Sequence, residues 1–178
     1  MSLQSTLEAA SFIALVATAA AGQTTPQAKP AAPSSYAIPI GTAISLDAAK
    51  KAAAGASAEA KKNGWFMAIA VVDPAGTLVY FEKADTTQLG SAPVAIGKAR
   101  SAALYKRPTK AFQDALEKGG ANLRVLALDG AVPIDGGVPL LIDGKLVGAL
   151  GVSGDLAEHD GQCATAGASA LGTTTAAR

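Results

Sequence analysis

The sequence predicts an α+β domain in which helices pack on an antiparallel sheet of about five strands. Two hairpin signals carry this prediction. Asp73-Pro74-Ala75-Gly76 has the residues of a type I turn and separates two apolar runs of strand length. Asp143-Gly144 favours the type I′ turn that joins neighbouring antiparallel strands. Ala-rich segments of helical length flank the hairpins, and this order argues against a doubly wound parallel fold.

The composition bounds the size and class of the protein. A chain of 178 residues fits one domain with additional segments, and 49% of its residues are hydrophobic against only 4% aromatic. The net charge of +1 is too small for a nucleic-acid or membrane-surface footprint, so we expect neither partner. One cysteine and one histidine exclude an internal disulfide and any metal site that needs several such side chains.

Residues 1–22 are interpreted as an export leader, because Ser11–Gly22 is an apolar run that ends in small residues. The alternative is a short N-terminal helix that packs on the domain or on a neighbouring subunit. Residues 23–44 are rich in Pro and Ala and form a predicted linker. The folded domain is then expected over residues 45–172, with residues 173–178 as a tail. A leader predicts a periplasmic or secreted protein.

The first hairpin follows a predicted helix over Ser45–Lys62. Ser45 is its expected N-cap, and Asn63-Gly64 is expected to end it in a left-handed conformation. Trp65–Val72 and Thr77–Phe81 are the two predicted strands.

Two helices are predicted after this hairpin. Ala92–Lys106 carries alanines at helical spacing, which allow close approach to a sheet or to a helix of another subunit. Pro108 is placed at the first position of a second, short helix that ends near Lys118.

The last third contains the remaining strands. Leu123–Leu128 and Ala131–Ile134 are short apolar segments, and one of them would supply the fifth strand. Val138–Ile142 and Lys145–Val152 flank Asp143-Gly144 and form the strongest hairpin signal in the chain.

A final helix is expected to begin at Asp155 and to run to about Leu171. Glu158 stands three residues after Asp155, which is the spacing of a capping box.

The combined pattern resembles the GlcG/HbpS-like family of small ligand-binding proteins. This resemblance implies a profilin-like domain that assembles into homo-oligomers. It also implies a small-molecule ligand, which is haem in some relatives, whereas other relatives belong to glycolate or diol metabolism. No catalytic residue is carried over. The segments that carry the resemblance are Ala68–Phe81, Lys98-Ala99, Arg107-Pro108-Thr109, Gly136–Gly154 and the helix containing Asp160, Ala164 and Ala166-Gly167.

Arg107-Pro108-Thr109 is the first candidate site. A helix start offers free N–H groups, and Lys98 and Arg107 are nearby cations, which suits a carboxylate or a haem propionate. Thr109 and Tyr105 offer oxygen atoms to a bound metal. The alternative is an ordinary helix start on a solvated basic face, because Lys98 and Arg100 point to different sides of a helix.

A second set of candidates concerns backbone and metal chemistry. Gly136-Gly137 is interpreted as a tight backbone entry into a strand, and the alternative is a place where a ligand approaches the bare chain. Ser153 lies where a strand meets a helix start, which is interpreted as helix capping, and the alternative is a pocket wall that cradles a ligand. His159 is the one conventional ligand for haem iron, and its alternative role is a surface histidine on a helix. Cys163 falls on the apolar stripe of the same helix and is expected to be a buried, inert thiol.

Three hypotheses follow for the function. The first is an exported, oligomeric binding protein for haem, another tetrapyrrole or a small organic acid. The second is an enzyme or accessory protein of glycolate or hydroxy-acid metabolism, which would have to use Arg, Lys, Asp or Tyr. The third is a structural module whose only task is assembly.

Overall fold

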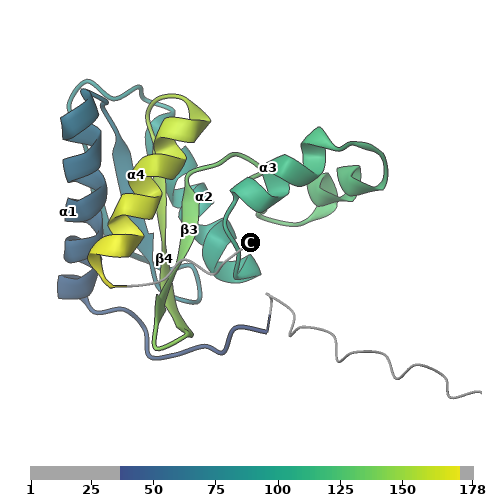
Figure 1. Ribbon diagram of the computed structural model, residues 1–178, viewed down its shortest axis with the longest axis horizontal. Helices are drawn as coiled ribbons and strands as arrows, with labels where there is room; N and C mark the ends of the chain where they lie inside the picture. The colour runs from purple at the N-terminus through teal and green to yellow at the C-terminus, as the bar shows by residue number, and fades with distance from the viewer. Residues whose placement is uncertain (1–36, 173–178) are drawn as a thin grey trace, which may run out of the picture. The chain divides into compact units, whose positions relative to one another are not determined.

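The structure, a computed structural model, describes residues 37–172 and contains two hairpins and five helical segments. Figure 1 shows the helices around the strands. The elements are α1 (Leu46–Asn63), β1 (Ala68–Val72), β2 (Leu78–Lys83), α2 (Ser91–Tyr105), α3 (Lys110–Glu117), the 3₁₀ helix η1 (Gly120–Ala127), β3 (Gly137–Ile142), β4 (Lys145–Ser153) and α4 (Ala157–Ala170).

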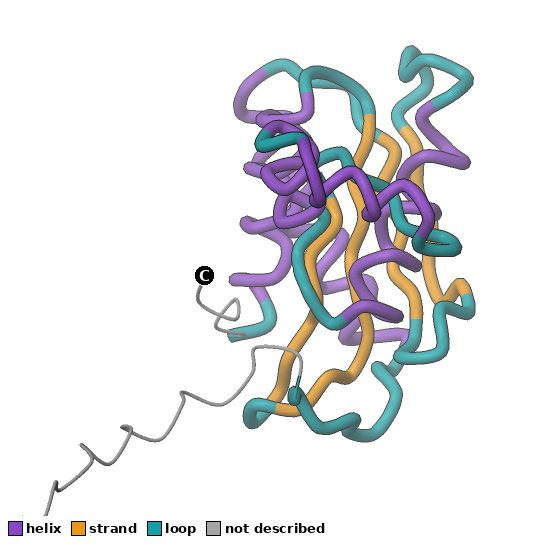
Figure 2. The backbone as a smooth tube through the Cα atoms, turned by 90° about the vertical axis from the view of Figure 1, so that its right-hand side faces the viewer, coloured by secondary structure: helices purple, strands orange, loops and turns teal. Residues whose placement is uncertain are grey.

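The strands form one antiparallel sheet in the order β2-β1-β4-β3. Figure 2 shows the strands side by side with helices on either face. Both predicted hairpins are confirmed, since β1 pairs with β2 and β3 pairs with β4. The two hairpins join through β1 and β4, where Ala68 lies opposite Ser153. Asp143 and Gly144 have φ values of 50° and 72°, as a type I′ turn requires.

The sheet has four strands in the described part of the chain, and the expected fifth strand is absent there. Leu123–Leu128 falls mostly in η1, and residues 131–134 form no strand. The left-handed Gly119 and Gly120 turn the chain back after α3, so η1 packs against α3 and does not reach a sheet edge. The profilin-like topology implied by the family resemblance stays a prediction.

Helices cover both faces of the sheet. α1 and α4 pack on one face, over Ile69 and Val71 of β1, whereas α2 packs on the other face, over Ala68, Ala70 and Val72. This alternation follows from the two-residue period of a strand. Because both faces are covered, β1 is apolar throughout and not alternating.

α2 lies so close to β4 that only glycine fits at position 151. A Cβ atom there would clash with the carbonyl oxygen of Ala95 and would lie 2.5 Å from the backbone nitrogen of Ala99. The alanines of α2 permit this approach, as the sequence predicted. The backbone of α2 is therefore positioned directly by β4.

The helix ends confirm some predictions and correct others. The Ser45 hydroxyl accepts a hydrogen bond from the Ala48 N–H, and Gly64 ends α1 in the left-handed conformation. The predicted capping box is wrong: α4 begins at Ala157, and its N-cap, Leu156, makes no side-chain cap bond. The Asp155 carboxylate instead accepts from the N–H of Leu156, beside it in the chain.

The start of α3 also differs from its prediction. Pro108 precedes the helix, and Thr109 is the N-cap before Lys110. The reason is that the Thr109 N–H donates to the carbonyl oxygen of Gly137 and fixes the chain there.

The leader and tail predictions lie outside the described residues. Of the predicted linker, residues 37–44 are described, and Pro39, Gly41 and Ile44 exchange backbone hydrogen bonds with Leu146 and Val147 of β4. This segment therefore extends the sheet contacts before α1. Within residues 37–172, no helix is both long and apolar enough to cross a bilayer.

We predict that Gly151→Ala lowers the free energy of unfolding by about 3 kcal/mol, because its methyl group must push α2 away from β4. Gly90→Ala is the matched control, since no atom would lie within 4 Å of the added methyl group and the φ of Gly90 is −67°. The control should change stability by less than about 1 kcal/mol. Urea unfolding followed by circular dichroism measures both, and equal effects would contradict the close contact.

Candidate functional site

Several of the predicted site residues meet around one buried ion pair. The Lys98 ammonium lies 2.7 Å from a carboxylate oxygen of Asp160 and donates a second hydrogen bond, of 3.1 Å, to the Val152 carbonyl. The Lys98 side chain is only 1% exposed and that of Asp160 only 3%. The pair thus fastens α2, on one side of the sheet, to α4, on the other, at the end of β4.

Gly136 and Gly137 lie against this pair, in positions where a residue with a Cβ atom would not fit. Gly136 has a φ of 119°, and a Cβ atom on it would lie 2.9 Å from the Lys98 ammonium. A Cβ atom on Gly137 would lie 2.6 Å from the methyl group of Thr109. Thr109 and Gly137 also exchange two hydrogen bonds of 2.9 Å, one of them to the Thr109 hydroxyl.

In a single copy of the chain, the polar residues around the Lys98–Asp160 pair are buried inside the protein. Lys98 and Thr109 are 1% and 0% exposed, and Ser153 is buried at the end of β4. Burial raises the pKa of Asp160 and outweighs the opposing effect of Lys98. Burial also raises the pKa of the neighbouring Asp135 carboxyl, which lies over Gly161. The contacts of this cluster connect parts of the protein to one another. The predicted role of its residues in ligand binding stays a prediction.

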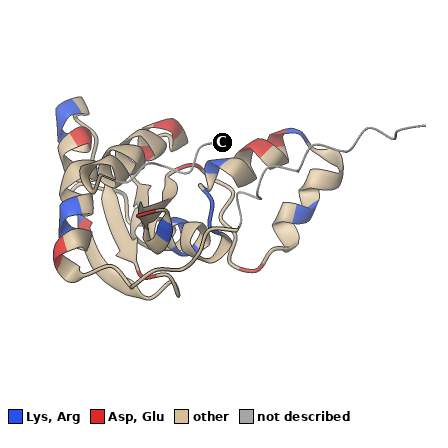
Figure 3. Ribbon diagram, turned by 60° about the horizontal axis from the view of Figure 1, so that its bottom comes forward, with Lys and Arg blue, Asp and Glu red and all other residues tan. Residues whose placement is uncertain are grey.

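The other two residues of this candidate site, Tyr105 and Arg107, lie nearer the surface. The Arg107 guanidinium stands 5.0 Å from the centre of the Phe112 ring and donates to the Tyr105 carbonyl oxygen. Tyr105 packs edge-on against Phe112, and its hydroxyl donates to the Asp129 carbonyl. In Figure 3, the blue of Lys and Arg marks the chain where α2 passes into α3. Arg107 and Tyr105 are half-buried here, whereas the Phe112 ring on which they pack is buried.

The segment that follows, residues 110–134, forms an arm that projects from the sheet (Figure 1). η1 contacts α3 and has one buried residue, Val125. Four large apolar side chains of the arm are exposed: Leu123, Leu126, Leu128 and Ile134. Exposed apolar side chains gathered on one segment are typical of a surface that meets a partner or a ligand.

His159 and Cys163 do not form a shared site. The His159 ring stacks on Trp65 with 3.9 Å between the ring centres, and its Nδ1 lies 3.5 Å from Asp155. Cys163 is fully buried, as expected, and burial raises the pKa of its thiol to about 12. The inertness of this thiol stays a prediction. Within residues 37–172, no cluster of three or more His, Cys, Asp or Glu side chains could hold a metal ion. His159 as an iron ligand stays a prediction.

Sequence reasoning missed a pair of pockets at one corner of the domain. They measure about 430 and 440 Å³ and share Gly64, Trp65 and Phe66, which connect α1 to β1. The predicted strand had included both aromatic residues. The available signal was two adjacent aromatic residues after the Asn63-Gly64 helix stop, in a chain that is only 4% aromatic.

Comparison with known families and sequences gives a consistent match. The family model described as haem degrading protein HbpS-like matches residues 44–169. Protein GlcG of Escherichia coli K12 is 35% identical over 110 residues, which cover 62% of this chain and 81% of GlcG.

Solved structures agree with this match. A double mutant of HbpS from Streptomyces reticuli superposes with a TM-score of 0.68 at 31% identity, covering 83% of this chain and 100% of HbpS. PduOC, crystallised as a complex with heme, gives a TM-score of 0.68 at 27% identity, covering 75% of this chain and 99% of PduOC.

We predict that Lys98→Met destabilises the fold by about 3 to 5 kcal/mol, because it leaves the Asp160 carboxylate buried without its partner. Adding Asp160→Asn removes that charge and should recover a large part of the loss. Since the pKa of Asp160 is raised in the folded state, the deficit of Lys98→Met should shrink as the pH falls through that pKa. Chemical unfolding at several pH values measures this, and a deficit that is independent of pH would contradict it.

Proposed function

Because this chain belongs to the HbpS-like family, we propose that it is an oligomeric binding protein for a flat, anionic tetrapyrrole, with haem as the first candidate. The observation that carries the proposal is the extent of the family match, residues 44–169, which includes the α2–α3 junction and the arm. The complex of the related PduOC with heme supports the choice of ligand.

The chemistry of the α2–α3 junction suits such a ligand. A tetrapyrrole has a wide apolar ring system and carboxylate groups at one edge. Arg107 supplies a guanidinium that pairs well with carboxylates, and the exposed apolar side chains of the arm supply surface for the ring. Phe112 is buried and packs under Arg107 and Tyr105. Tyr105 is the oxygen donor at this surface, because the Thr109 hydroxyl is buried. Haem would supply the redox chemistry of its iron when bound.

Assembly is part of the same proposal. Leu123 and Leu126 of η1 are 53% and 68% exposed, and a 3₁₀ helix of eight residues is unusually long for an element with so little packing. A second copy of the chain that covers the arm would bury these side chains. It would also close the ligand surface from the other side, which a single copy leaves open.

Export completes the proposal. It rests on the apolar run Ser11–Gly22, and we infer a periplasmic or secreted location from it. Recovery of the full-length chain from the cytosolic fraction of its own host would count against export.

We predict a saturable Soret shift when purified protein is titrated with hemin at micromolar concentrations. Arg107→Ala should weaken binding about tenfold or more, because it removes a charge-assisted hydrogen bond to a propionate. Arg107→Lys should recover only part of the affinity, since it keeps the charge and loses the planar fork. Lys51→Ala, on the exposed side of α1, changes the net charge equally and should leave binding unchanged.

A spectrum that stays flat in the wild-type protein removes haem as the ligand. Thermal unfolding of each variant separates lost binding from lost folding, because Arg107 also packs on Phe112.

We further predict that Leu126→Asp disrupts assembly, because it places a charge in the proposed interface at a side chain that is 68% exposed in one copy. Light scattering after size-exclusion chromatography should show oligomers for the wild-type protein and a smaller species for the variant. Leu46→Asp, at an exposed leucine at the start of α1, is the control and should leave the mass unchanged. A monomeric wild-type protein would contradict the proposed assembly.

A further inference from the structure

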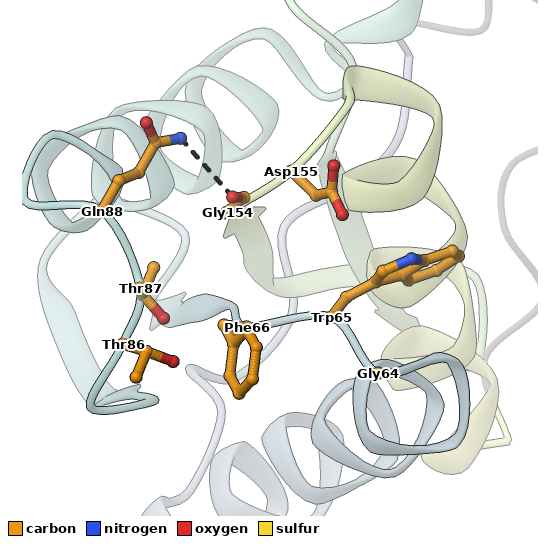
Figure 4. A pocket seen from close by; sticks show the side chains of 8 residues that line it. All are labelled: Gly64, Trp65, Phe66, Thr86, Thr87, Gln88, Gly154 and Asp155. Carbon is orange, nitrogen blue, oxygen red and sulfur yellow. Dashed lines mark hydrogen bonds between the residues drawn. The ribbon is translucent and has the colours of Figure 1, made fainter.

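The pocket of about 430 Å³ beside Trp65 and Phe66 combines side chains from three separate segments. Figure 4 shows Phe66 in the middle, Thr87 and Gln88 on the loop before α2, and Gly154-Asp155 where β4 ends. Its volume falls within the range of small-molecule sites. The α1–β1 connection, the β2–α2 loop and the end of β4 each supply one wall of the pocket. The position of each wall is therefore set by a different part of the fold.

Thr87 gives this pocket a polar group without a partner. Thr87 is only 5% exposed, and its hydroxyl oxygen makes no hydrogen bond within the described part of the chain. Figure 4 shows the hydroxyl groups of Thr86 and Thr87 directed toward the side on which Phe66 lies. A buried hydroxyl without a partner costs about 1 to 3 kcal/mol, which a ligand that bonds to it would restore.

The remaining polar groups favour a ligand that offers hydrogen-bond donors. The Gly154 carbonyl and the Asp155 carboxylate can only accept, and the carbonyl receives only a long bond of 3.5 Å from the Gln88 amide. Hydroxyl and amide groups, as in Thr87 and Gln88, both donate and accept. Phe66 is 56% exposed, so its ring is available to contact a ligand in the pocket.

The charges around the pocket favour a neutral ligand. Asp155 is the one charged residue that lines it, and it would repel an anion. A small cation would face a net positive charge in the adjoining pocket, which shares Phe66 and is lined by Lys61 and Lys83 together with one acid, Glu82. It would also face the positive end of the α2 dipole, which begins at Ser91.

We propose that this pocket binds a small, neutral, polyhydroxylated molecule of about monosaccharide size. An apolar C–H face of the ligand covers the Phe66 ring. Its hydroxyl groups bond to the Thr87 hydroxyl, the Gln88 amide and the Asp155 carboxylate. This site is separate from the tetrapyrrole surface at the α2–α3 junction, and neither proposal depends on the other.

The test uses the full chain and its single tryptophan, Trp65, as a fluorescent reporter in the pocket wall. Methyl β-D-glucopyranoside and glycerol are the neutral probes, ethanolamine is the cationic probe, and acetate is the anionic probe. We expect saturable changes with a neutral probe at about 1 to 10 mM, the affinity expected from a few hydrogen bonds to a small ligand. We expect no saturation with either charged probe.

Thr87→Val is the decisive variant, because it keeps the shape of the side chain and removes only the hydroxyl. It should weaken binding about three- to tenfold while leaving the melting temperature equal or higher, since no protein hydrogen bond is lost. Phe66→Ala should weaken binding further by removing the ring. Thr42→Val, at an exposed threonine before α1, is the matched control and should bind as the wild type does.

Three outcomes would overturn the proposal. One is the lack of saturable binding by both neutral probes. Another is stronger binding of ethanolamine or acetate than of the neutral probes. The third is binding of a neutral probe that is unchanged in Thr87→Val and Phe66→Ala, which would place it elsewhere. Hemin titration of the same variants should be unaffected, so failure here is distinguishable from failure at Arg107.

Discussion

The buried pair of Lys98 and Asp160 is the constraint on which the arrangement of this domain depends. It joins α2 to α4 across the end of the sheet, and two glycines, Gly136 and Gly137, leave space for it. A charged pair in such a place needs complete hydrogen bonding to be tolerated, and the Val152 carbonyl supplies part of it. The start of α3, and therefore the direction of the arm, is fixed beside this pair by Thr109 and Gly137.

Much of the fold could be predicted because its signals are local. The turn at Asp143-Gly144, the cap at Ser45 and the stop at Gly64 each depend on a few neighbouring residues. The predicted fifth strand failed because apolar residues alone do not distinguish a short strand from a helical turn. In η1 the outcome depends on the backbone reversal at Gly119 and Gly120 and on contact with α3.

In the candidate sites, too, features with local signals could be predicted, whereas contacts between distant segments could not. The sequence marked Lys98 as a cation near a helix start, but its partner Asp160 is 62 residues away, and no local pattern predicts that contact. The pocket beside Phe66 was missed because its walls come from three segments, each of which looks ordinary alone. Arg107 and Tyr105 were found because they share one short stretch. The family resemblance was confirmed, because it combined several segments in a fixed order.

The depth of Cys163 has a practical consequence. Its thiol is shielded by α1, α4 and the sheet, and its raised pKa, about 12, leaves almost no thiolate near neutral pH. A thiol reagent therefore reacts only in molecules in which this packing around α4 has opened. Because the chain contains one cysteine, the rate at which its thiol is labelled reports how often this opening occurs, without any probe having to be introduced into the protein.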